Sequence, residues 1–224
     1  MKLTEYVDSE MMMLDLASRV AGDLENILLT NDRASLVVPG GSTPGPMFDV
    51  LSAANIDWAR VDVMLTDERW VPLDHSRSNT GMLKARLFKN RAAAANLIPF
   101  YQDGVDSVEG AASISDRVTA FMPLGVVVLG MGTDMHCASL FPGAPELQAA
   151  QASDAPAVYP MSPGDGLEPR VTLSARALAS AMSLHILIIG DEKRIALEAA
   201  QDLPFDKAPI GQFISKSDIH WAKA

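Results

Sequence analysis

Two kinds of hydrophobic pattern alternate along the chain. Four consecutive aliphatic residues at 126–129 predict a strand buried on both faces, and largely apolar runs at 35–38, 61–66 and 184–189 predict further strands. Between these runs, apolar residues recur at steps of three and four, which predicts amphipathic helices; the longest covers about 9–30. This alternation predicts an α/β fold, with a mainly parallel sheet covered by helices on both faces.

The remaining predicted elements are shorter. We expect further helices near 47–51, 82–88, 107–121, 175–181, 190–200 and after Pro209, and short strands at 97–100, 169–173 and 219–221. Residues 142–165 hold five prolines and few periodic positions, so an irregular surface excursion and candidate lid is expected there. No linker-like composition interrupts the chain, which predicts one domain over 1–224.

Composition narrows the classes of partner. The chain has 224 residues and a formal net charge of −10, and its Lys and Arg residues do not cluster, which argues against a surface for nucleic acid or anionic membranes. A single cysteine cannot form an internal disulfide. With no signal-peptide or membrane-span pattern, we expect a cytoplasmic protein that binds small molecules, as a monomer or a small homo-oligomer.

The first candidate site follows the strand at 126–129. The segment Gly130-Met131-Gly132-Thr133-Asp134-Met135-His136 ends that strand with glycines and then supplies a carboxylate and an imidazole. Ligands of open parallel sheets bind at the carboxyl ends of the strands, so Asp134 and His136 are expected at the edge where chemistry occurs. The alternative is a Gly-rich turn with a helix-capping Asp and a surface His.

The second candidate site follows the strand at 35–38. Gly40, Gly41, Ser42 and Thr43 precede a predicted helix, for which Thr43 is a plausible N-cap and Pro44 a plausible first residue. The amides of this turn would then be free to face an anion such as phosphate. The turn matches neither the dinucleotide fingerprint nor the P-loop, and a plain β-to-α turn explains it equally well.

A third cluster of polar residues ends the strand at 61–66. Asp67, Glu68 and Arg69 are adjacent there, and burying three charged side chains without partners would be costly. These residues are therefore either exposed to solvent or used in a site.

The order and spacing of these three segments resemble the 6-phosphogluconolactonases, which belong to the glucosamine-6-phosphate isomerase/deaminase-like superfamily. The resemblance is carried by the segments 40–44, 67–72 and 130–136, and it extends to Ser78-Asn79, to 138–142, to 169–172, and to Gly190 with Lys193. It implies a three-layer α/β/α domain around a mainly parallel sheet. It also implies hydrolysis of 6-phospho-D-glucono-1,5-lactone to 6-phosphogluconate, in the pentose phosphate pathway, without metal or organic cofactor.

The resemblance also implies roles for individual residues. It makes His136 the catalytic base and Asp134 its supporting acid, with Arg69 at the catalytic centre as a contact to the anionic substrate. The implied substrate- and phosphate-binding residues are Gly40, Gly41, Ser42, Thr43, Asp67, Arg170 and Lys193. General acid–base chemistry agrees with this allocation, because an unperturbed imidazole is largely neutral at pH 7 and can take a proton from water.

Two residues depart from the family pattern. The family usually has Gly where this chain has Met135, and Thr where it has Cys137. If the Gly position needs φ > 0, Met135 carries about 1–2 kcal/mol of backbone strain. Cys137 beside His136 raises the alternative of a cysteine hydrolase, but adjacent side chains rarely face each other, and we interpret Cys137 as a small packing residue.

Two other functions use related folds. A sugar-phosphate isomerase or deaminase would carry an acidic residue shortly after the His, and residues 137–143 contain none; Arg69 also stands where such enzymes usually have a neutral aromatic residue. A non-catalytic sugar-phosphate sensor would normally carry an attached DNA-binding module. The chain lacks the extra length and the basic patch for one.

Overall fold

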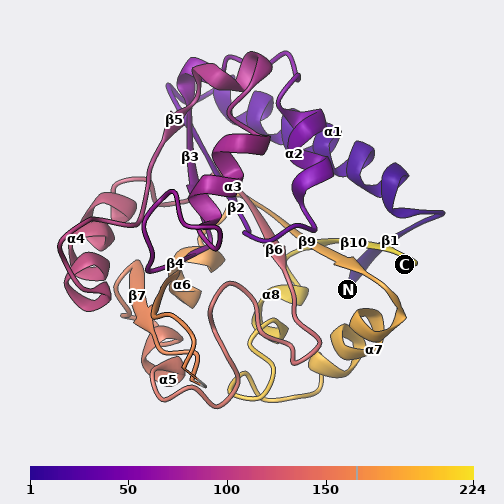
Figure 1. The fold of residues 1–224 in the computed structure, drawn as a ribbon. Helices are drawn as coiled ribbons and strands as arrows, with labels where there is room; N and C mark the ends of the chain where they lie inside the picture. Colours follow the sequence, from indigo (N-terminus) through magenta and orange to yellow (C-terminus); the bar gives the residue numbers. More distant parts are fainter. Residues whose placement is uncertain (165) are drawn as a thin grey trace.

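The computed structural model describes residues 1–164 and 166–224, and its centre is a seven-stranded sheet in which every pairing is parallel (Figure 1). The strand order is β1-β10-β9-β6-β2-β3-β5. The strands are β1 (Lys2–Tyr6), β2 (Ala34–Val38), β3 (Val61–Leu65), β5 (Asn96–Leu97), β6 (Val126–Gly130), β9 (Ser183–Ile189) and β10 (Asp218–Ala222). The predicted mainly parallel sheet is therefore confirmed.

Helices cover both faces of this sheet. On one face, α1 (Ser9–Leu28), α2 (Gly45–Leu51) and α3 (Asn79–Arg86) share a hydrophobic cluster with β2, β3 and β6. The other face packs against a second cluster contributed by α4 (Ser107–Thr119), α5 (Leu147–Ala150), α6 (Ala175–Ala179), α7 (Asp191–Ala200) and α8 (Gly211–Ile214). Two short 3₁₀ helices, η1 (Trp58–Arg60) and η2 (Asn90–Ala94), precede β3 and β5. The arrangement is the expected three-layer α/β/α fold (Figure 1).

A second, antiparallel sheet was not expected from the sequence. It has the order β4-β8-β7, with β4 (Asp67–Arg69), β8 (Arg170–Leu173) and β7 (Val158–Met161). Its buried side chains Val171, Leu173 and Val158 belong to the second cluster. Thr66 joins the two sheets, because its N–H bonds to Val38 of the main sheet (2.9 Å) and its carbonyl accepts from Leu173 of the small one (2.8 Å).

Local sequence explains where the long helix α1 begins and which face it buries. Asp8 caps its N-terminus, where the carboxylate accepts a hydrogen bond from the N–H of Met11 at 2.8 Å. Leu16, Val20 and Leu24 recur at steps of four and are fully buried against the sheet. No helix of residues 1–164 and 166–224 is long and apolar enough to cross a membrane.

A chain of polar side chains lies where α1 packs against β9 and β10, with two buried histidines at its centre and half-buried residues at its ends. His185 Nδ1 lies 3.1 Å from His220 Nε2, and His185 Nε2 lies 2.9 Å from the carboxylate of Asp23. At the other end, His220 Nδ1 lies 2.8 Å from the hydroxyl of Tyr6, which donates to Asp15 at 2.5 Å. Burial, together with the neighbouring His185, lowers the pKa of His220 to about 4.

Several predicted boundaries were wrong. Lys2–Tyr6 forms an edge strand that was not predicted, and Asp67–Arg69 is a strand rather than a loop. The excursion predicted at 142–165 contains α5 and β7, and its last residue, Asp165, lies outside the described residues. These elements are short or lie at an edge, so their hydrophobic signal in the sequence is weak.

Candidate active site

The order of the strands in the main sheet reverses between β2 and β6, because β3 lies beyond β2 on one side and β9 lies beyond β6 on the other. These neighbouring strands are parallel, but after β2 the chain goes to α2 on one face, and after β6 it goes towards the small sheet on the other. The crevice outside the carboxyl ends of two such strands is where open α/β sheets bind ligands. Two predicted site loops, 40–44 and 130–136, start from this pair of strands.

A pocket of about 230 Å³ lies at this place. Segments that follow β2 and β6 line it, together with side chains of β4, β8, β9, α3 and α7. Its lining residues are Pro39, Gly40, Gly41, Thr43, Pro44, Asp67, Arg69, Asn79, Gly130, Met131, Gly132, His136, Ala138, Arg170, Leu187 and Lys193. Three cationic side chains therefore meet a single histidine in one pocket.

His136 is oriented by Asp134. Its Nδ1 lies 2.5 Å from Oδ1 of Asp134, and the carboxylate also accepts from the backbone N–H of His136 at 3.3 Å. A carboxylate can only accept a hydrogen bond, so its partner nitrogen must carry a proton. The pair therefore favours the imidazole tautomer with the proton on Nδ1. Nε2 of His136 is then left as a proton acceptor.

The loop that carries this pair is tightly folded. The N–H of Gly132 donates to the carbonyl of His136, and the N–H of Met135 donates to the carbonyl of Gly132, both at 3.0 Å. A Cβ on Gly132 would lie 2.3 Å from Oδ1 of Asp134 and 2.4 Å from Nδ1 of His136, so a larger residue there would displace the pair. Met135 has φ = +68°, as expected if this position needs a left-handed backbone.

The turn after β2 differs from the prediction in its helix cap. α2 begins at Gly45 with Pro44 at the N-cap position, so the expected N-cap Thr43 is wrong, and no side chain caps the helix. Pro44 takes the N-cap position because the turn before the helix extends one residue further than predicted. The N–H of Gly45 closes this turn by donating to the carbonyl of Ser42 at 3.1 Å. In the described chain, no backbone carbonyl accepts from the N–H groups of residues 40–43.

Gly40 is required because Asn79 packs against it. A Cβ on Gly40 would lie 2.1 Å from the side-chain amide of Asn79. Asn79 is itself fixed, because its Nδ2 donates to the backbone carbonyl of Asp67 at 3.0 Å. This contact joins the turn after β2 to the start of α3 and to β4.

Two arginines lie directly opposite each other in the small sheet. Arg69 of β4 is the register partner of Arg170 of β8. The nearest carboxylate to Arg170 is that of Asp67, with 3.7 Å between Nη1 and Oδ2. Burial, and the proximity of Arg69 and Arg77, lower the pKa of Arg170 despite Asp67. The Nε atoms of Arg69 and Arg170 are buried without a hydrogen-bond partner in the described chain.

Asp67 and Glu68 have different local roles. Asp67 accepts hydrogen bonds from Ser139 Oγ at 2.6 Å and from Thr66 Oγ1 at 3.0 Å, which leaves it beside Arg170 in the pocket. Glu68 is fully buried and accepts from the N–H groups of Asn79 (2.8 Å) and Thr80 (2.7 Å) at the start of α3. Glu68 is thus a structural anion at a helix N-terminus.

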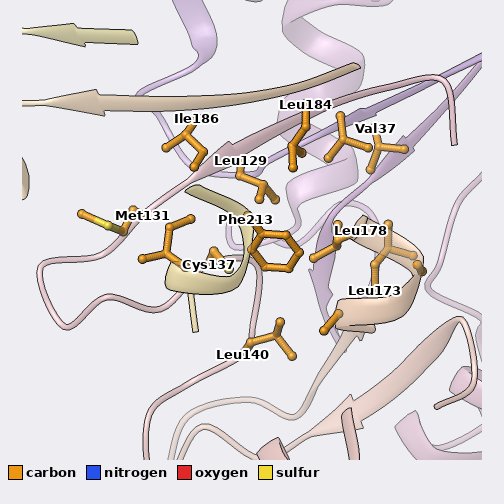
Figure 2. Packing of buried hydrophobic residues seen from close by; sticks show 14 of the residues in the cluster. Val37, Leu129, Met131, Cys137, Leu140, Leu173, Leu178, Leu184, Ile186 and Phe213 are labelled. Atoms are coloured by element: carbon orange, nitrogen blue, oxygen red, sulfur yellow. The ribbon is translucent and has the colours of Figure 1, made fainter. Parts of the chain in front are cut away.

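Cys137 lies in the hydrophobic core. It is fully buried, and Figure 2 shows it among Met131, Leu140 and Phe213. Burial raises the pKa of its thiol, which opposes formation of a thiolate nucleophile. The interpretation of Cys137 as a packing residue is confirmed.

The structure brings most of the predicted site residues together. Of the ten, all except Ser42 and Asp134 line the pocket; Asp134 contacts His136 from outside it, and Ser42 lines a separate groove beside α1. The sequence did not single out Asn79, Met131, Ala138 or Leu187 as pocket residues. Asn79 was visible only as part of the Ser78-Asn79 motif, and Leu187 carried no signal except as a strand residue.

Comparison with known proteins places this architecture in a family. The family model described as glucosamine-6-phosphate isomerases/6-phosphogluconolactonase matches residues 7–221, which is nearly the whole chain. The chain belongs to this family.

Within the glucosamine-6-phosphate isomerase/6-phosphogluconolactonase family, similar relatives share one name. A 6-phosphogluconolactonase from Pseudomonas putida is 34% identical over 225 residues, covering 98% of this chain and 92% of that protein. One from Rhizobium meliloti strain 1021 is 38% identical over 216 residues, covering 92% of each. The crystal structure of a 6-phosphogluconolactonase from Shewanella baltica OS155 has a TM-score of 0.94 at 30% identity, and covers 99% of this chain and 97% of that one.

Proposed function

We propose that the protein hydrolyses 6-phospho-D-glucono-1,5-lactone to 6-phosphogluconate. The observation that carries the proposal is the pairing of His136 with Asp134 at the edge of a pocket that also holds Arg69, Arg170 and Lys193. A base and a cluster of cations suit a substrate that has both a hydrolysable carbonyl and a phosphate. Full-length relatives named 6-phosphogluconolactonase support the choice of lactone.

In the proposed reaction, His136 acts as the general base. Its Nε2 takes a proton from a water molecule whose oxygen forms a bond to the lactone carbonyl carbon. The tetrahedral intermediate then breaks its bond to the ring oxygen, which receives that proton from the imidazolium and becomes a hydroxyl. Asp134 holds the Nδ1 proton and stabilises the imidazolium between the two steps.

The proposed oxyanion and phosphate contacts come from different elements. Arg69, whose Nε has no partner in the described chain, stabilises the negative charge that develops on the carbonyl oxygen. Arg170, Lys193 and the amides of Gly40, Gly41 and Thr43 bind the phosphate, with Asp67 orienting Arg170. We assign Ser42 only a backbone contribution, because Ser42 does not line this pocket.

The test is an assay of lactone hydrolysis with the spontaneous rate subtracted. We expect the protein to accelerate hydrolysis of the freshly made phosphorylated lactone, and His136→Ala to lower kcat by about 10²- to 10⁴-fold. Unphosphorylated glucono-1,5-lactone should show a kcat/KM lower by about 10³-fold or more, and inorganic phosphate should compete with the substrate. No acceleration by the folded wild type would refute the proposal.

A further inference from the structure

Phe141 contacts two residues to which we have given separate roles. Its ring centroid lies 4.8 Å from that of His136, with the rings tilted by 49°. The guanidinium carbon of Arg170 lies 5.3 Å from the same ring centroid. One aromatic side chain therefore touches both the proposed base and a proposed phosphate ligand, although it does not itself line the pocket.

This ring is not part of the hydrophobic core. Phe141 is half-buried and belongs to neither of the two hydrophobic clusters in residues 1–164 and 166–224, whereas Phe121 packs against the second of them. The backbone of Phe141 closes a turn by accepting from the N–H of Ala144 at 3.1 Å, an interaction that any side chain allows. Core packing therefore does not explain why this position carries a phenyl ring.

Arg170 needs a support of this kind. Its side chain is 11% exposed, yet within the described chain its Nε has no hydrogen-bond partner, and the carboxylate of Asp67 lies 3.7 Å from Nη1, beyond hydrogen-bond distance. A ring face attracts a guanidinium through the ring quadrupole and leaves all its N–H groups free. The phenyl ring can thus hold the cation in place without consuming the donors that an anion would use.

His136 has a similar need. Asp134 holds one nitrogen of the imidazole, but the side chain of Asp134 is itself 57% exposed. A single hydrogen bond at one edge of the imidazole leaves the ring free to rotate about that bond. The phenyl ring packs against the imidazole and restricts this rotation.

We propose that Phe141 is a positioning residue that fixes both the imidazole of His136 and the guanidinium of Arg170, so that water activation and phosphate binding are held in one geometry. The inference rests on the proposed function for the meaning of these two groups. The observed contacts themselves do not depend on the reaction.

The experiment compares Phe141→Leu with Phe141→Tyr and with the control Phe121→Leu. For Phe141→Leu we expect KM for the phosphorylated lactone to rise about 3- to 30-fold and kcat to fall about tenfold or more. With unphosphorylated glucono-1,5-lactone only kcat should fall, because no phosphate is present to bind Arg170. Phe141→Tyr keeps the ring and should restore both constants to within about threefold of the wild type.

Stability measurements separate positioning from a general structural effect. In urea, Phe121→Leu should unfold at a lower concentration than the wild type and keep its kcat/KM, whereas Phe141→Leu should keep its unfolding midpoint and lose activity. In an Arg170→Ala background, Phe141→Leu should raise KM by less than twofold, because its partner is gone. An equal rise in KM in both backgrounds, or unchanged constants in Phe141→Leu, would overturn the inference.

A binding experiment keeps this test separate from that of the reaction. Titration with inorganic phosphate should give a Kd about 3- to 30-fold higher in Phe141→Leu than in the wild type, and unchanged in Phe121→Leu. If the wild type fails to hydrolyse the lactone, the proposed function is refuted, and the phosphate titration still decides whether Phe141 holds Arg170. Equal phosphate affinities in all three proteins would show that it does not.

Discussion

The left-handed backbone at Met135 leads to a prediction about stability. Met135 has φ = +68° in the loop that carries His136, and its side chain is half-buried against the core. We compare Met135→Gly with Met135→Ala, because both changes remove the same packing beyond Cβ and differ only in how well they tolerate this backbone conformation.

The expected difference follows from two opposing effects. A left-handed conformation costs a residue with a Cβ about 1–2 kcal/mol, and only the glycine variant is relieved of it. Glycine lowers the free energy of unfolding by about 0.5–1 kcal/mol relative to alanine, because glycine gives the unfolded chain more conformational freedom. Met135→Gly should therefore be more stable than Met135→Ala by about 0.75 kcal/mol, within a range of about 0 to 1.5 kcal/mol, and the midpoint corresponds to about 2 °C in Tm for a chain of this size.

The measurement is urea unfolding of both variants, with Ala199→Gly as the control. Ala199 lies on the exposed side of α7, where the backbone is helical, so glycine should be less stable than alanine there by about 1 kcal/mol. The order of the two residues should thus reverse between positions 135 and 199. If Met135→Ala proves more stable than Met135→Gly by about 1 kcal/mol, as at position 199, the left-handed conformation is not adopted in solution.

Three further predictions concern the site loop, a buried anion and a buried imidazole. Gly132→Ala should lower kcat by at least about 10²-fold in the lactone assay, because its Cβ would meet Asp134 and His136 at 2.3–2.4 Å; near-normal kcat would contradict the loop geometry. Glu68→Gln should lower the free energy of unfolding in urea by about 2–3 kcal/mol, since its amide group would face the N–H donors of α3; an unchanged midpoint would refute this. His220 has a folded pKa of about 4 against about 6.5 when unfolded, so the unfolded state binds more protons between these values, and stability is lost as the pH falls. Its contribution should shrink by about 2 kcal/mol from pH 7 to pH 5, and His220→Asn should lose less stability than the wild type over this range; equal losses would show that His220 is not the group responsible.

The sequence predicted the main sheet well because its strands are buried on both faces. A strand such as Val126–Gly130 must be apolar at consecutive positions, and this signal is local. Lys2–Tyr6 pairs only with β10 at the edge of the sheet, so its polar residues are tolerated and no such run exists. The same reasoning explains why edge strands escape prediction more often than central ones.

The small sheet could not be predicted because its stability comes from distant contacts. Asp67–Arg69 consists of three charged residues, and its partner Arg170–Leu173 lies about a hundred residues later in the chain. Pro160 interrupts the pattern of the third strand. Arg170–Leu173 was predicted as a strand, but its pairing with the other two segments depends on tertiary contacts that periodicity within a window of the sequence does not report.

For the site, the sequence identified side chains next to glycine-rich strand ends. His136, Asp134 and the turn at 40–43 follow main-sheet strands directly, and the topology delivers them to one edge. The contact of Asn79 with Gly40, and that of Phe141 with Arg170, depend on how separate elements pack. Neither contact has a signature in residue spacing.

The opposed pair Arg69 and Arg170 has a consequence for how long the protein survives a protease. Like charges directly across a strand pair oppose its pairing, so the small sheet is held together against a repulsion that Asp67, 3.7 Å from Arg170, offsets only in part. The phosphate that we propose for Arg170 would offset this repulsion and would bind only the folded state, which would lower the fraction of molecules open to cleavage. Digestion by a protease should therefore be slower when a phosphorylated ligand is present than when it is absent.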